Sequence, residues 1–134
     1  MRYFLVIVLL SATLFASEDW NFSKKYVAEC DSELPSKINN CLEKRYKSVD
    51  KKLNTIYQIL KKKTINNDTV LLVSAQKSWL KFKEEECKFY NPKELNFGSY
   101  YIFEQLVCEI DMTEKRIKDL ERYLKRSGCG SCRW

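Results

Sequence analysis

The most reactive side chains in this 134-residue chain are six cysteines. Two of them, Cys129 and Cys132, form a C-x-x-C motif, which is the spacing of thiol–disulfide oxidoreductases. Those enzymes place the first cysteine at a helix N-terminus, where the helix dipole lowers the pKa of the thiol. Here a predicted helix ends before the motif, and only Arg133 and Trp134 follow it. We therefore favour a terminal disulfide or a bond to another chain over a redox centre or metal capture by the thiolates.

The chain contains no histidine. This removes the Ser-His and Cys-His nucleophile systems, the usual general base at neutral pH and the commonest zinc ligand. The sequence also lacks the second C-x-x-C pair that would complete a four-thiolate zinc site. The acidic run Glu84-Glu85-Glu86 has no metal-ligand spacing and is interpreted as a solvated helix face. We predict no catalytic residue, no cofactor and no metal site, and therefore a protein that is not an enzyme.

The N-terminal segment has the features of a secretory signal peptide. Arg2 precedes an apolar run over residues 4–10, and the small residue Ala16 follows. The run is too short to span a bilayer, and acidic residues come directly after it. We predict a signal peptide over residues 1–17, with cleavage after Ala16 or Ser17, and a periplasmic or secreted product. An Asn-x-Ser sequon in this region makes glycosylation of Asn21 a further hypothesis.

Export would place the cysteines in an oxidising compartment, where disulfides form and persist. Six cysteines allow fifteen pairings, among which the sequence alone does not choose. The spacing suggests a hypothesis in which the first four pair with their neighbours and two are left over. The pairs are Cys30 with Cys41 and Cys87 with Cys108, and the remaining two are Cys129 and Cys132.

Three helices are predicted, because apolar residues recur at steps of three or four. The first helix spans about Ser36 to Lys63, and the last carries a regular apolar series from Phe103 to Leu124 and ends at Ser127-Gly128. The second opens after Asp68 or Thr69 and stops before Pro92. Its periodic positions are Leu72, Ala75, Gln76, Trp79, Phe82, Lys83, Glu86 and Cys87.

Short connections between these helices force antiparallel neighbours. We therefore predict an all-α fold, an antiparallel three-helix up-down-up bundle with an N-terminal arm, stapled by disulfides. The helical domain would cover residues 18–126, and residues 127–134 would form a Cys-containing tail.

Several short motifs are spaced along the predicted helices. They are Asn40-Cys41, Tyr46, Asp50-Lys51-Lys52-Leu53-Asn54 with Tyr57, Gln76 with Trp79, Lys83 and Cys87, and Cys108 with Thr113, Arg116 and Leu120. Together they resemble the lysozyme inhibitor LprI-like N-terminal domain family over about Cys30 to Leu124. The resemblance implies an exported, helical, disulfide-bonded protein whose named activity is inhibition of lysozyme. Position 83 departs from the family pattern, which usually has Arg there, and the tail lies outside the pattern.

The motif residues also have a structural interpretation. Asp50, Lys83 and Arg116 are charges at the margins of apolar stripes. We expect Asp50 to accept from Arg116 or Lys83 in a network that fixes helix register. The aromatic residues on these stripes, Tyr46, Tyr57 and Trp79, are expected in the core. The residues interpreted as structural are Asp50, Leu53, Asn54, Tyr57, Gln76, Trp79, Lys83 and Arg116.

The net charge of the chain limits which partners it can attract. The chain has 24 Lys and Arg against 18 Asp and Glu, a formal net charge of +6, and the first predicted helix has a basic face ending in Lys61, Lys62 and Lys63. Such a face is usually solvated, but it also attracts anionic lipid or wall polymer, or places a lysine near the carboxylate pair of a lysozyme. Positive charge opposes long-range steering towards a lysozyme that is itself basic.

We predict an exported binding protein that inhibits a lysozyme or another peptidoglycan hydrolase. The alternative is a noncatalytic envelope protein that binds anionic wall polymer, a lipid surface or a membrane protein through the basic helix face. We expect no nucleic-acid partner, because an exported chain without a recognition motif is poorly suited to one.

Overall fold

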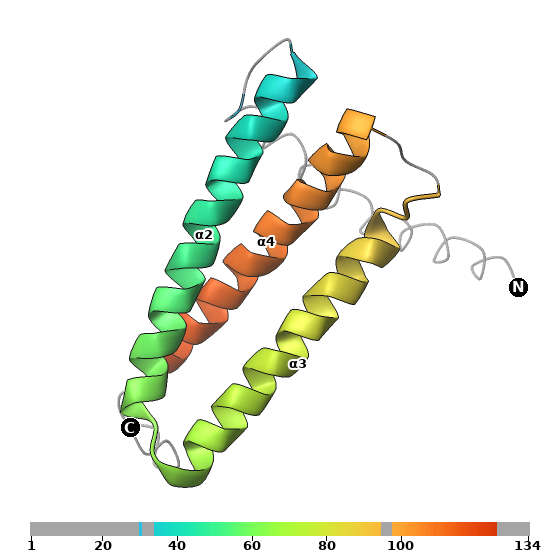
Figure 1. The fold of residues 1–134 in the computed structure, drawn as a ribbon. Helices are drawn as coiled ribbons and strands as arrows, with labels where there is room; N and C mark the ends of the chain where they lie inside the picture. Colours follow the sequence, from blue (N-terminus) through green and yellow to red (C-terminus); the bar gives the residue numbers. More distant parts are fainter. Residues whose placement is uncertain (1–29, 31–33, 95–97, 126–134) are drawn as a thin grey trace, which may run out of the picture.

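The computed structural model describes residue 30, residues 34–94 and residues 98–125. These residues form three helices: α2 (Pro35–Lys63), α3 (Asn66–Tyr90) and α4 (Gly98–Lys125). Successive helices run in opposite directions (Figure 1), and the described part of the chain contains no strand. The predicted all-α up-down-up bundle is confirmed. The predicted signal peptide, the C-x-x-C tail, Asn21 and the arm before Cys30 lie outside the described residues.

The ends of the helices follow from local chemistry. α2 begins at Pro35, whose fixed φ suits the first turn of a helix, and ends with three lysines that interact favourably with the helix dipole. The Thr64 backbone N–H then donates to the Leu60 carbonyl at 3.1 Å. Asn66 has a φ of 51°, in the left-handed region that asparagine tolerates. The chain therefore reverses at once, and α3 begins at Asn66 rather than after Asp68 or Thr69 as the sequence suggested.

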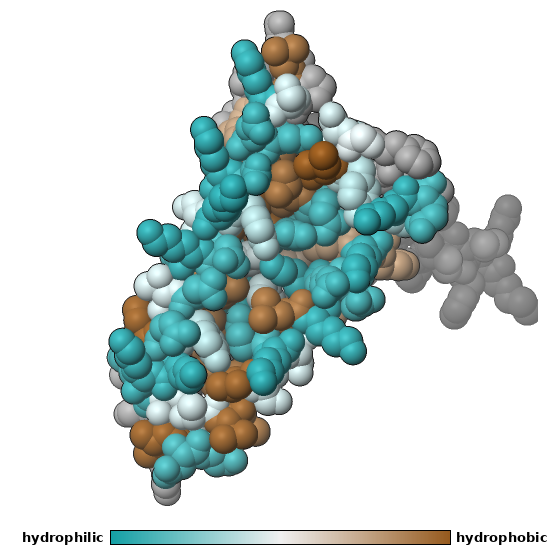
Figure 2. All heavy atoms as spheres, viewed as in Figure 1, coloured by the Kyte–Doolittle hydropathy of each residue, from teal (hydrophilic) through white to brown (hydrophobic). Residues whose placement is uncertain are grey.

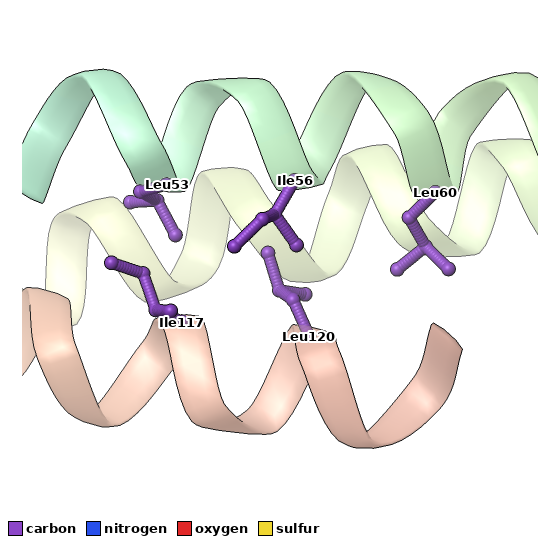
Figure 3. Close-up of a cluster of buried hydrophobic side chains, with 5 residues drawn as sticks. All are labelled: Leu53, Ile56, Leu60, Ile117 and Leu120. Carbon is purple, nitrogen blue, oxygen red and sulfur yellow. The ribbon is translucent and has the colours of Figure 1, made fainter. Parts of the chain in front are cut away.

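The core lies mainly between α2 and α4. One hydrophobic cluster of buried residues contains Cys30, Leu42, Val107 and Ile110. The other contains Leu53, Ile56, Leu60, Ile117 and Leu120, whose side chains point towards one another from the two helices (Figure 3). Interhelical ion pairs flank this core, with the Arg45 guanidinium 2.7 Å from Glu114 and the Lys52 ammonium 3.0 Å from Glu121. Hydrophobic burial thus holds α2 and α4 together along their length.

α3 is attached differently, because its buried residues are Gln76, Lys83 and Cys87. Leu72 and Trp79 are half-buried and pack against the second cluster. The disulfide Cys87–Cys108, with a Cα–Cα distance of 5.7 Å, joins α3 covalently to α4. Polar and aromatic contacts and one covalent bond therefore hold α3 in the bundle, whereas aliphatic packing holds α2 and α4 together.

The second disulfide, Cys30–Cys41, joins the segment before α2 to the first turns of that helix. The two bonds have the pairing that the spacing of the first four cysteines suggested. None of the described helices combines the length and apolarity needed to cross a membrane.

Candidate functional site

The motif residues of all three helices meet in one interhelical polar layer, defined here as Tyr46 of α2, Gln76, Trp79 and Lys83 of α3, and Arg116 of α4. Tyr46 packs against the first hydrophobic cluster and Trp79 against the second. The layer therefore lies where the two clusters adjoin. It is the most polar part of the interior among the described residues and the only place where α3 presents charge to the other helices' core.

Lys83 is the central residue of this layer, and only 8% of its surface is exposed. Its ammonium donates a hydrogen bond to the Tyr46 hydroxyl at 3.4 Å. The same nitrogen lies 5.3 Å from the centroid of the Tyr46 ring and 5.4 Å from that of Trp79, within the range of cation–π attraction. Within the described part of the chain it makes no ion pair with a carboxylate. Aromatic faces and one hydroxyl thus offset the cost of burying this charge.

Arg116 completes the layer from α4. Its Nε donates to the Gln76 side-chain oxygen at 3.1 Å. Its guanidinium carbon lies 5.8 Å from the Trp79 ring centroid. Trp79 thus contacts two cations, Lys83 from its own helix and Arg116 from α4. Because a planar guanidinium stacks and hydrogen-bonds at once, Arg116 fixes both the position of Trp79 and the register of α3 against α4.

The expected pairing of Asp50 with Arg116 or Lys83 is not made. The Asp50 carboxylate instead accepts from the Asn54 side chain at 2.9 Å, one turn further along α2. A partner on the same helix needs no side chain to reach across the bundle, while the two cations find aromatic rings and neutral acceptors. Interhelical contacts of Lys83 and Arg116 are present, but the predicted acceptor was wrong, because Asp50 takes no part in them.

The remaining motif residues have ordinary structural places. Leu53 is buried in the second hydrophobic cluster, and Tyr57 is half-buried against it. Asn54 is exposed and bonded to Asp50. The sequence predicted Tyr46, Tyr57 and Trp79 as core, and all three are half-buried at its edge. The contact of Lys83 with the two rings was missed, although a lysine four residues after a tryptophan on one helix face was the signal for it.

Burial raises the pKa of the Tyr46 hydroxyl from 10.0 to about 12, and the nearby carboxylates of Glu109 and Asp50 add to the rise. The folded protein therefore holds this proton more tightly than the unfolded chain does. The resulting stability is fully present below about pH 10 and is lost as the pH rises through about 12.

Tyr46→Phe should accordingly make the free energy of unfolding fall less steeply between about pH 10 and pH 12 than in the wild type. Urea unfolding across this range measures the effect. The two proteins share every other titrating group, so the difference between their profiles reports the titration of Tyr46 together with its effect on the groups it contacts. Parallel profiles would contradict the assignment.

The polar layer contains no arrangement suited to catalysis. It has a phenol, an ammonium, an amide and a guanidinium, but no nucleophile paired with a general base. The described residues contain no group of three or more Cys, Asp or Glu side chains that could hold a metal ion. A cavity of about 360 Å³ at the turn between α3 and α4 is lined by residues of both charges, among them Glu84, Lys88 and Lys93. The layer is an element of the scaffold.

The comparison with protein families identifies this scaffold. The family model described as "Lysozyme inhibitor LprI" matches residues 29–120. The match covers both disulfides and the whole polar layer. The chain belongs to the lysozyme inhibitor LprI family. No curated protein and no solved structure matches the chain.

The LprI motifs thus mark mainly residues that hold the bundle together. Two exposed surfaces lie away from this layer. One is the basic face of α2, a helix with nine basic and two acidic side chains, whose terminal lysines Lys61, Lys62 and Lys63 are exposed. These three lysines make no ion pair within the described residues. The other is the outward side of α3, which carries the Glu84-Glu85-Glu86 run and several apolar side chains.

Proposed function

We propose that this protein inhibits a lysozyme or another peptidoglycan hydrolase by binding it. The observation that carries the proposal is the LprI family match over residues 29–120, since the family is named for lysozyme inhibition. A rigid, disulfide-bonded bundle suits such a role, because a preorganised surface loses little conformational entropy on binding.

Lysis of a cell-wall suspension by a panel of lysozymes tests this proposal. The purified oxidised protein should slow lysis by at least one of them, and the rate should approach zero once the protein exceeds the enzyme. An unrelated protein of similar size and similar positive net charge serves as the control for nonspecific effects. Unchanged lysis across the panel, with the protein in excess, would contradict the proposal.

A second candidate function rests on the charge of α2. An envelope protein that binds anionic wall polymer or lipid would use the exposed lysines at the end of this helix, each worth about 1 kcal/mol near an anionic surface. Cosedimentation with wall polymer distinguishes the two functions. Binding through the basic face should fall steeply between low and physiological salt, because exposed charges are screened. Binding absent at low salt would remove this candidate.

We further propose that the chain is exported, with residues 1–17 as its signal peptide, residues 18–126 as the helical domain and residues 127–134 as a separate tail. The two disulfides support export, because such bonds persist in oxidising compartments and are rare in the cytosol. Mass spectrometry of the mature protein from its native host would give the N-terminus directly.

A further inference from the structure

The outward side of α3 carries a second apolar stripe that the bundle does not use. Leu71 is 58% exposed, Phe82 is 54% exposed and Phe89 is 85% exposed. Ala75 and Ser78, which lie between them on the same side, are exposed as well. Their spacing of three, four or seven residues places all five on one helix face. Figure 2 shows apolar side chains at the surface among hydrophilic ones near the start of α3 and along it.

This outer face of α3, defined as these five residues with Glu85 and Glu86, is acidic. At 100° per residue, Glu85 and Glu86 fall on either side of the stripe. The exposed lysines of the helix, Lys77, Lys81 and Lys88, project further round its circumference. The Lys88 ammonium lies 3.4 Å from the Glu85 carboxylate, whereas Glu86 makes no ion pair within the described residues. The face therefore combines exposed aromatic rings with negative charge, although the chain as a whole is basic.

The length of the face suits the centre of a protein interface. From Leu71 to Phe89 the stripe runs about 27 Å along the helix, at 1.5 Å per residue. Stable protein interfaces bury about 800 Å² on each partner, so a stripe one helix wide would form the middle of such an interface and neighbouring side chains would supply the rest of its area. Their energetic centres are rich in exposed aromatic residues surrounded by a polar rim. Phe82 and Phe89 with flanking carboxylates have this composition.

We infer that a basic lysozyme docks on the outer face of α3. This inference rests on the proposed function and names the surface that performs it. The two phenylalanines supply the apolar contact, and Glu85 and Glu86 attract the positively charged enzyme. A second copy of the chain is a poorer occupant, because two such faces would bring carboxylates together. This placement reduces the charge conflict seen in the sequence, since the positive excess resides on α2 and the enzyme meets Glu85 and Glu86 on α3.

The test compares variants in the wall-lysis assay and in direct binding to a basic lysozyme. Phe82→Ser with Phe89→Ser should weaken inhibition and affinity by about tenfold or more, as expected for the loss of central interface residues. Glu85→Gln with Glu86→Gln should slow association and reduce its salt dependence. The matched control, Lys61→Gln with Lys62→Gln on α2, should not weaken either. Because all of these side chains are exposed, the melting temperatures should stay near that of the wild type.

The outcomes separate the inference from the proposed function. If the phenylalanine variant inhibits as strongly as the wild type, the inference is overturned and the proposed function stands. A wild type that binds and inhibits no lysozyme would overturn both. A third result is a wild type that sediments as a dimer, which the phenylalanine substitutions dissociate while inhibition is unaltered. That result would assign this face to a second copy of the chain and overturn the inference.

Discussion

Replacing Cys87 and Cys108 together by serine is expected to lower the free energy of unfolding by about 3 kcal/mol, the usual worth of a bond that closes a loop of this length. The loss should be concentrated in α3. This helix buries Gln76, Lys83 and Cys87 and has no fully buried aliphatic side chain among its described residues. Urea unfolding gives the change in free energy, and amide hydrogen exchange shows where protection is lost. We expect α3 amides to exchange before those of α2 and α4.

The disulfide at the start of α2 provides the matched control. Removing it by Cys30→Ser with Cys41→Ser also costs about 3 kcal/mol in the chain-entropy model. This bond joins the segment before α2 to α2 and does not involve α3, so the α3 amides should keep their protection relative to the other helices. Equal exchange in all three helices of the Cys87→Ser, Cys108→Ser variant would contradict the view that this bond secures α3.

Leu120→Ala is expected to destabilise the protein by about 3 kcal/mol, within the range for fully buried leucines. Leu120 is 0% exposed and faces Leu53, Ile56 and Leu60 across the α2–α4 interface (Figure 3). Truncation removes apolar burial and leaves a cavity between two helices that are both held by this cluster. Thermal and urea unfolding measure the loss.

A control for this substitution is Ile59→Ala on α2. Ile59 is one residue before Leu60 but is 43% exposed, so its truncation should change the free energy of unfolding by less than about 0.5 kcal/mol. Similar losses for the two variants would show that the second cluster is not the principal α2–α4 contact.

Much of the fold was predictable because its signals are local. The three- and four-residue spacing of apolar positions on α2 and α4 matches the buried side chains closely, from Leu42 to Leu60 and from Ile110 to Leu120. The first residue of α3 was placed late, because the left-handed turn at Asn66 is not visible in an apolar pattern. The network around Lys83 was anticipated in kind but not in its partners. Choosing among several acceptors within reach depends on distances between helices.

The sequence by itself determined the helices, their antiparallel order and membership of the LprI family, because periodicity and spacing are properties of the chain alone. It only suggested the pairing of the first four cysteines, which the structure confirms. Only the tertiary structure decided which side of α3 faces inward. Its sequence carries two stripes of helical spacing, one with Gln76, Lys83 and Cys87 and the other with Phe82 and Phe89. The sequence counted Phe82 among the inward positions, and the structure exposes it. The disulfide to Cys108 and the contacts of Lys83 with Tyr46 turn the polar stripe inward, and these are interactions between residues far apart in the chain. Because these contacts turn Gln76, Lys83 and Cys87 inward, the side of α3 that carries Phe82 and Phe89 is left on the surface.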